Sequence, residues 1–250
     1  MKRLFLIAFV LLLLGGAVYG KTFKVLVLTG NRTNVEFPVL QKFKKLGPHD
    51  LEFKSTSDRT LPDLENYDIL WIGQGEICEN AYFFDKDTEE KIKKFVENGG
   101  IVISVGQDSD AGRPCEVGWL PGVQLVGVER GGTETFEVTD AAEVDDLFKV
   151  PNEIKQAHFD DAWTQPDPQI IVLATINAGQ DLGIGLLLYG KGAYIITSLE
   201  NETASDVSIN APMMENLLYY AVNFLPTILT PVEPLEKLPV VWGELKEARM

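Results

Sequence analysis

The first half of the chain contains short apolar runs of the length of β-strands, and three of them end at a glycine. Residues 22–30, 67–73 and 99–106 have this pattern, and residues 50–56 form a further strand candidate. Runs that are apolar on both faces are typical of strands buried inside a parallel sheet. The pattern therefore predicts a parallel sheet whose glycine-marked strand ends lie along one edge.

Helical patterns separate these strands. Residues 34–46 carry apolar side chains at helical spacing, and a second helix is predicted to begin at Asp87 as N-cap, with Glu90 three positions later, and to end at Gly99. Strands that alternate with helices at this spacing favour right-handed crossover connections. The prediction is an α/β fold with a flavodoxin-like or Rossmann-like, doubly wound and mostly parallel sheet.

The second half of the chain has a different pattern. Residues 123–129 and 133–138 are short, partly alternating segments, and three more strand candidates follow at residues 170–177, 183–188 and 193–198. Because no long helix lies among them, we expect an antiparallel β extension of the sheet. A last amphipathic helix is predicted from Asn210, as N-cap, through Leu225.

The two ends of the chain differ from the middle. Residues 1–20 have a basic start, an apolar centre and a small-residue end, which predicts a secretory signal peptide cleaved after Gly20. Residues 21–225 are expected to form one domain, and residues 226–250 a proline-rich tail. We therefore expect a secreted or periplasmic protein with no membrane insertion after cleavage.

The chain is acidic, with 22 Lys and Arg against 37 Asp and Glu and a net charge of −15 when histidines are neutral. Cleavage after Gly20 removes Lys2 and Arg3 and no acidic residue, which leaves a net charge of −17. Binding to nucleic acid or to an anionic membrane surface needs basic residues that neutralise phosphates. The charge therefore argues against nucleic acid and membrane surfaces as partners.

Cys78 and Cys115 are the only two cysteines. In an exported protein an even number of cysteines favours a disulfide, and both residues fall in loops after neighbouring strands of the predicted sheet. Two buried thiols, or one reactive thiol, are the alternatives, because spacing in sequence does not fix the distance between the two Cα atoms.

Several segments taken together resemble the class I glutamine amidotransferase-like superfamily, in particular its ThuA-like (trehalose utilisation-like) branch. These segments are residues 67–73, 99–106 and 190–198, together with residues 147–152, Asp160 and Trp163. The resemblance covers about residues 24–225. It implies that Gly73, Gln74 and Gly75 are the remnant of a loop whose backbone N–H groups hold an oxyanion in active members.

The resemblance does not extend to a catalytic triad. Active members carry a Cys at the turn after the fourth strand and a His with a carboxylate after the late strand. Here the turn has Gln107 and Asp108, and the late strand runs into Glu200 with no His; neither His49 nor His158 stands at that position in the sequence. We therefore expect no glutaminase activity.

Three functions remain open. The first is a non-catalytic domain that binds a small polar ligand, with carbohydrate as one class, or a protein partner at the carboxyl edge of the sheet. The candidate contacts are Glu76, Gln107, Asp108, Asp110, His158, Asp160, Trp163 and Glu200. No cofactor and no metal ion is expected.

The second function is a carboxylate-based hydrolase acting on a carbohydrate or a related small molecule. His158, Asp160 and Asp161 would lie beside Asp108 or Glu200 and act as acid and base, or as metal ligands. The third is a structural module of an extracellular or envelope assembly that makes its contact through the tail, at Trp242.

Overall fold

The computed structural model describes residues 20–29, 34–73, 84–105, 114–115, 117–123, 125–128, 132–139, 146–159, 161–164 and 166–229. The predicted leader, apart from Gly20, and almost all of the tail lie outside these residues, so both remain predictions. Within the described part of the chain, no helix combines the length and hydrophobicity needed to cross a membrane.

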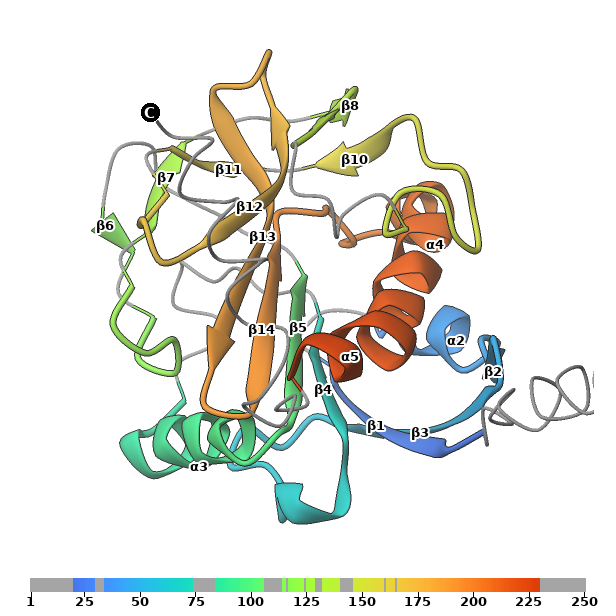
Figure 1. Ribbon diagram of the computed structural model, residues 1–250, viewed down its shortest axis with the longest axis vertical. Coiled ribbons are helices and arrows are strands. Elements are labelled where there is room, and N and C mark those ends of the chain that lie inside the picture. Colours follow the sequence, from blue (N-terminus) through green and yellow to red (C-terminus); the bar gives the residue numbers. More distant parts are fainter. Residues whose placement is uncertain are drawn as a thin grey trace, which may run out of the picture.

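Five parallel strands form the centre of the sheet. They are β1 (Thr22–Leu28), β3 (His49–Thr56), β4 (Ile69–Ile72), β5 (Ile101–Val105) and β14 (Gly192–Thr197). Their spatial order is β3-β1-β4-β5-β14, with every neighbouring pair parallel (Figure 1). Counted along the chain this is the order 2-1-3-4-5 of flavodoxin-like sheets, which confirms the predicted fold class.

The antiparallel extension is also present. β13 (Asp181–Tyr189) pairs antiparallel with β14, and the sheet continues through shorter strands. These are β11 (Ala162–Thr164), β7 (Leu125–Val128) and β6 (Pro114–Cys115), with β12 (Ile171–Ile176) and β9 (Glu137–Val138) joined to β13 as a branch. β2 (Lys45–Leu46) closes the opposite edge, while β8 (Gly132–Glu134) and β10 (Ala157–Phe159) form a separate two-stranded sheet.

Helices cover both faces of the parallel strands. On one face lie α2 (Phe37–Leu40), α4 (Ala204–Tyr219), the π-helical segment η4 (Tyr220–Phe224) and α5 (Leu225–Leu229); on the other lie η1 (Leu64–Asn66) and α3 (Lys86–Glu97) (Figure 1). Successive strand residues alternate between the two resulting cores: Val25 packs on the α4 side and Leu26 on the α3 side. Burial on both faces explains the uninterrupted apolar runs of the sequence.

Three predicted helix boundaries were wrong. Residues 34–46 form only the single turn of α2, after which the chain folds back through Gly47, at a φ of 62°, so that β2 can pair with β3. α3 is capped by Asp85, whose side chain accepts a hydrogen bond from the Thr88 N–H, two residues before the predicted cap.

The last helix begins earlier than predicted. Thr203 is its N-cap, and Thr203 and Asp206 form a reciprocal capping box. Asn210 therefore lies inside α4, where it is buried and bonded to other parts of the chain. An asparagine in a helix interior is neutral to unfavourable for the helix itself, so tertiary contacts explain its position.

A second buried asparagine of α4 anchors the segment that precedes β10. Asn216 Nδ2 donates to the Leu147 and Asn152 carbonyl oxygens at 2.7 and 2.8 Å, and its Oδ1 accepts from the Asn152 N–H at 3.0 Å. One side chain thus satisfies three backbone groups of a loop that has no regular structure of its own.

Replacing Asn216 should destabilise the fold more than replacing its neighbour. Asn216→Leu leaves buried backbone groups without partners, at about 1–3 kcal/mol each, so we expect a loss of about 3 kcal/mol in the free energy of unfolding by chemical denaturation. Glu215→Leu, which removes one contact to the Asn152 side chain on the same helix, is the matched control and should cost under about 1 kcal/mol. Equal losses in both variants would contradict the anchoring role.

Candidate functional site

The candidate site lies where β14 ends at the carboxyl edge of the parallel strands. Leu199 forms an isolated antiparallel bridge with Phe159 of β10, and the Glu200 N–H donates to the His158 carbonyl oxygen at 3.0 Å. This short pairing places the side chains of two distant residues next to each other. His158 therefore reaches the end of the late strand from another part of the chain.

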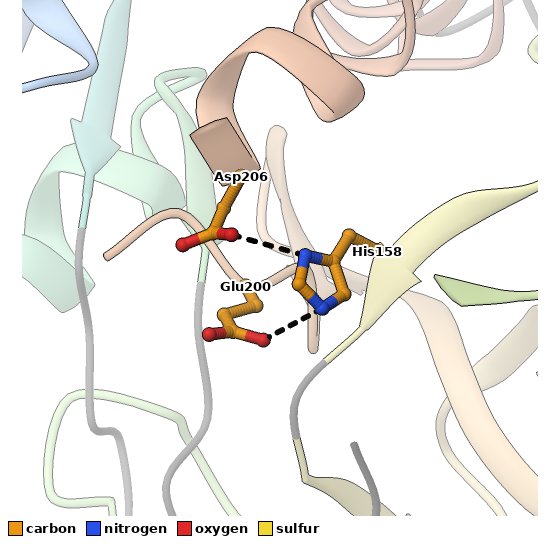
Figure 2. A group of neighbouring side chains, drawn as sticks. All are labelled: His158, Glu200 and Asp206. Atoms are coloured by element: carbon orange, nitrogen blue, oxygen red, sulfur yellow. Dashed lines mark ion pairs between the residues drawn. The ribbon is translucent and has the colours of Figure 1, made fainter. Parts of the chain in front are cut away.

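The imidazole of His158 lies between two carboxylates (Figure 2). Its Nε2 is 3.0 Å from Glu200 Oε2, and its Nδ1 is 3.2 Å from Asp206 Oδ1. Both contacts are ion-pair distances without the alignment of a hydrogen bond, and Nδ1 is fully buried. The three side chains are 17%, 22% and 9% exposed in the order His158, Glu200, Asp206, so solvent reaches both the imidazole and Glu200.

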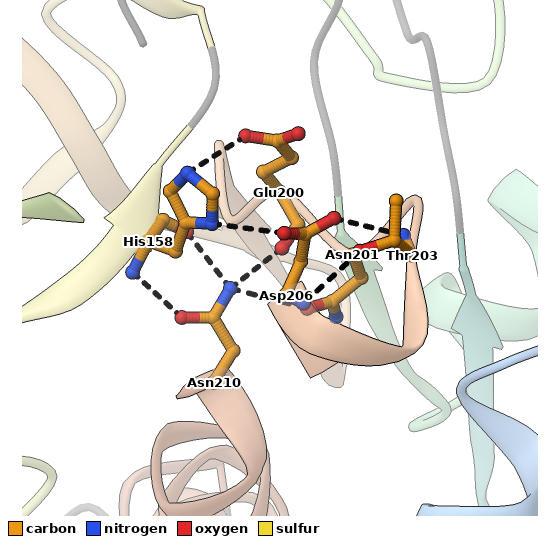
Figure 3. Close-up of polar contacts among 6 residues, drawn as sticks. All are labelled: His158, Glu200, Asn201, Thr203, Asp206 and Asn210. Atoms are coloured by element: carbon orange, nitrogen blue, oxygen red, sulfur yellow. Dashed lines mark hydrogen bonds and ion pairs between the residues drawn. The ribbon is translucent and has the colours of Figure 1, made fainter. Parts of the chain in front are cut away.

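Asn210 holds the backbone on both sides of this contact (Figure 3). Its Oδ1 accepts from the His158 N–H at 2.7 Å, and its Nδ2 lies 2.8 Å from the His158 carbonyl oxygen and 2.7 Å from that of Glu200. A single buried amide therefore fixes β10, the segment after β14 and helix α4 relative to one another. The position of the imidazole beside Glu200 depends on this clamp.

Asp206 is held by the start of α4. Its Oδ2 accepts from the Thr203 N–H at 2.8 Å, and its own N–H donates to Thr203 Oγ1 at 3.3 Å (Figure 3). The capping box thus uses one carboxylate oxygen and leaves Oδ1 facing His158. A carboxylate in the first turn is also stabilised by the positive end of the helix dipole.

A second buried carboxylate extends the network toward the centre of the sheet. Asn201 Nδ2 donates to Glu36 Oε1 at 2.7 Å, the Trp71 Nε1–H lies 3.4 Å from the same oxygen, and Asn201 Oδ1 accepts from Asn210 at 3.1 Å. Glu36 follows β1 in the chain and Trp71 lies in β4. The polar network therefore runs from the point between β1 and β4, where ligands bind in flavodoxin-like folds, to the His158 group.

Gly73 makes room for this carboxylate. A Cβ atom on Gly73 would lie 1.6 Å from Glu36 Oε2, so no larger residue fits without displacing Glu36. The Gly73 N–H donates to the Leu28 carbonyl oxygen at 3.2 Å. That N–H therefore takes part in the sheet, while Gln74 and Gly75, the other two residues of the implied loop, lie outside the described residues.

The surroundings of Glu200 shift the pKa of its carboxyl group upward. Burial raises the pKa of Glu200 above its ordinary value of 4.5; His158 opposes this, while the negative charges of Asp206, Glu202 and Asp161 add to it. A cation bound among these carboxylates would relieve their mutual repulsion, because an opposite charge nearby favours the charged form of a carboxyl group.

The structure describes only some of the residues that the sequence analysis named as site candidates. It brings His158 and Glu200 together, as the hydrolase hypothesis anticipated. Trp163, one of the candidate contacts, is 0% exposed in the core around α3, because β11 lies between β7 and β13. The remaining candidates Gln74, Gly75, Glu76, Gln107, Asp108, Asp110 and Asp160 lie outside the described residues, as does Cys78, so its pairing with Cys115 stays a prediction.

The sequence did not identify Glu36, Asn201 and Asp206 as members of the network. It identified Asn210 as a helix cap and missed its role in the network. Asp206 had a readable signal, since Thr203 and Asp206 fit the spacing of a capping box and mark a helix start. Glu36 and Asn201 had none, because isolated polar residues in loops do not reveal which neighbours they meet.

The fold is similar to that of known structures at low sequence identity. A cytoplasmic protein from Salmonella typhimurium matches with a TM-score of 0.52 and 15% identity, over 80% of this chain and 97% of that one. A β-galactosidase from Bacillus circulans matches with a TM-score of 0.50 and 12% identity, over 80% of this chain and 30% of that one. At these identities the likeness shows a shared fold alone.

The structural neighbours also include ThuA-like proteins. One from Parabacteroides merdae has a TM-score of 0.49 and 14% identity, over 82% of this chain and 90% of that one. No protein-family model matches the sequence, and no curated protein matches it.

Removing the clamp should cost both stability and the order of the site. Asn210→Ala leaves the His158 N–H and two carbonyl oxygens without this partner, so we expect a loss of about 2–4 kcal/mol in chemical denaturation. Ser208→Ala, at an exposed position of the same helix, is the control and should change stability by less than about 0.5 kcal/mol. A loss in Asn210→Ala no larger than in the control would show that the clamp is dispensable.

The raised pKa of Glu200 predicts a pH dependence. A carboxyl whose pKa is higher in the folded than in the unfolded state contributes stability that is fully present below its unfolded pKa, here 4.5, and is lost as the pH rises through the folded value. The free energy of unfolding of the wild type, relative to Glu200→Gln, should therefore fall as the pH rises above 4.5 when both are measured in EDTA. A relative gain over the same range would contradict the assigned cause.

Proposed function

We propose that this chain is an exported, glutamine amidotransferase-like domain without the triad, which binds a small hydroxyl-rich ligand at the carboxyl edge of its parallel sheet. The observation that carries the proposal is the His158 group, which consists of the His158 imidazole and the Glu200 and Asp206 carboxylates. Asn210 and the α4 capping box hold this group in place at the end of β14, where it is partly exposed to solvent. Polar groups that are held rigidly are suited to recognising a ligand without a large ordering cost.

Carbohydrates are the first class of ligand to test. Each sugar hydroxyl is both a donor and an acceptor, and a carboxylate oxygen can accept from it while an imidazole N–H donates to it. Glu200 Oε1 points away from the imidazole (Figure 2) and is the oxygen that an incoming hydroxyl would meet. The β-galactosidase of similar fold is a further reason to begin with sugars, although the fold alone implies no shared ligand.

The binding test compares two charge-matched variants. Isothermal titration of the purified protein in EDTA with galactose, glucose, cellobiose and trehalose should find saturable binding of at least one sugar, and Glu200→Gln should weaken it by about tenfold, equal to about 1.4 kcal/mol. Glu97→Gln removes the same charge at the opposite end of β14, where Lys191 donates its N–H to the Glu97 carbonyl oxygen, and should leave the affinity unchanged.

Two results would contradict the proposal. One is the absence of saturable binding for all four sugars. The other is binding that Glu200→Gln and Glu97→Gln weaken equally, since the effect would then reflect total charge and not the site.

Hydrolysis is the second candidate function, and the flanked imidazole favours it. Asp206 lies beside Nδ1 and Glu200 beside Nε2, so a proton can pass between the ring and a carboxylate that solvent reaches. The resemblance places a His and a carboxylate after the late strand in active members, and here the imidazole approaches that position from β10.

The hydrolase alternative predicts turnover of 4-nitrophenyl glycosides. His158→Gln should lower kcat by about 10²–10⁴-fold, the usual contribution of general acid and base catalysis, while His49→Gln leaves it unchanged. Wild-type protein without measurable turnover would reject this alternative and leave the binding function standing.

A further inference from the structure

We propose that His158, Glu200 and Asp206 form a binding site for a divalent transition-metal ion of the zinc class. One ligand atom from each of the three side chains lies within 4.8 Å of the other two (Figure 2). Three protein ligands, with a further position left for water or a ligand, are the usual composition of an open zinc site. The inference goes beyond the proposed function, because an ion can bind here without any organic ligand.

The ligand types select the kind of ion. Imidazole nitrogen suits zinc, copper, iron and nickel, whereas calcium and magnesium prefer sites made only of oxygen ligands. Two carboxylates with one neutral imidazole supply two negative charges, which match a divalent cation. The mixed nitrogen and oxygen set therefore favours zinc over calcium.

The state of the imidazole is a second, independent observation. His158 Nδ1 is fully buried and makes no hydrogen bond with any part of the chain that the structure describes, although Asp206 Oδ1 is 3.2 Å away. A buried ring nitrogen without a partner is costly, and coordination to an ion would remove that cost. One ion takes only one ring nitrogen, so the side chains must move for all three ligand atoms to reach bond lengths of about 2.0–2.2 Å.

The surrounding residues hold the ligands as outer-shell partners do in metal sites. The Thr203 N–H occupies Asp206 Oδ2 and leaves Oδ1 toward the imidazole. Asn210 fixes the backbone of both His158 and Glu200. Asn210 thus fixes the backbone of His158 and Glu200, and Thr203 fixes one carboxylate oxygen of Asp206. The side-chain atoms that face one another are not used by these contacts.

Calorimetric titration of purified, tag-free protein that has been stripped with EDTA and dialysed tests the proposal, with zinc chloride and calcium chloride as probes. We expect one zinc ion per chain and an affinity for zinc at least about tenfold higher than for calcium. His158→Ala should weaken zinc binding by about 100-fold or more. His49→Ala removes the other of the two histidines of the chain and should leave the affinity within about twofold of the wild type.

Asp206→Asn is the second test variant, because its side chain can still accept the Thr203 N–H and so preserve the start of the helix. It should weaken zinc binding by about 10–100-fold with an unchanged circular dichroism spectrum. The proposal is overturned by the absence of saturable zinc binding, by an affinity that His158→Ala leaves unchanged, or by an equal loss in His49→Ala.

The ion and the sugar are tested separately. Sugar binding is measured in EDTA, so a protein that binds a sugar there and no zinc would overturn only the metal site. A protein that binds zinc through His158 and no sugar would overturn only the proposed function.

Discussion

The geometry of the site depends on one buried amide. The side chain of Asn210 bonds to both backbone groups of His158, to the Glu200 carbonyl oxygen and to Asn201, and it is 1% exposed. Among the described residues, the bridge of Phe159 with Leu199 is the only sheet pairing between β10 and the segment after β14, so the amide takes the place of a ladder. A buried amide with all its groups satisfied specifies one arrangement, because any shift leaves several partners unpaired.

The carboxylates add a second constraint that works against stability. Glu36 and Asp206 are almost completely buried and Glu200 is partly so. Burying a carboxylate is costly unless hydrogen bonds and opposite charges compensate. Asn201 provides that compensation for Glu36, the α4 capping box for Asp206, and His158 for Glu200. Because such a group is costly to bury, its presence at the edge of the sheet is better explained by ligand binding than by a contribution to folding. This is the physical basis of the proposed function.

The sequence predicted the layout of the sheet well and the site only in part. Apolar runs such as residues 101–105 are periodic signals that local physics explains, and the described strands follow them closely. Helix ends were less accurate, as at Asn210, because the helix-capping preference of an asparagine is local while its buried role depends on residues far away in the chain.

The meeting of His158 with Glu200 shows why the rest could not be read from the sequence. In linear order no histidine follows the late strand, and the absence suggested that no imidazole stands there. In the folded structure, the three-residue strand β10 places the imidazole of His158 at that position. Such a contact depends on how an irregular loop is anchored, here by Asn216 to α4, and spacing along the chain does not contain that information.

The central claim is that the His158 ring is held against a carboxylate at the end of β14, and nitrogen-15 NMR of the two imidazoles tests it most directly. The account predicts that Glu200→Gln changes the ring-nitrogen chemical shifts of His158 and leaves those of His49, which lies in an exposed contact with the Lys21 backbone, unchanged. Shifts of the His158 ring that Glu200→Gln leaves unchanged would contradict the account.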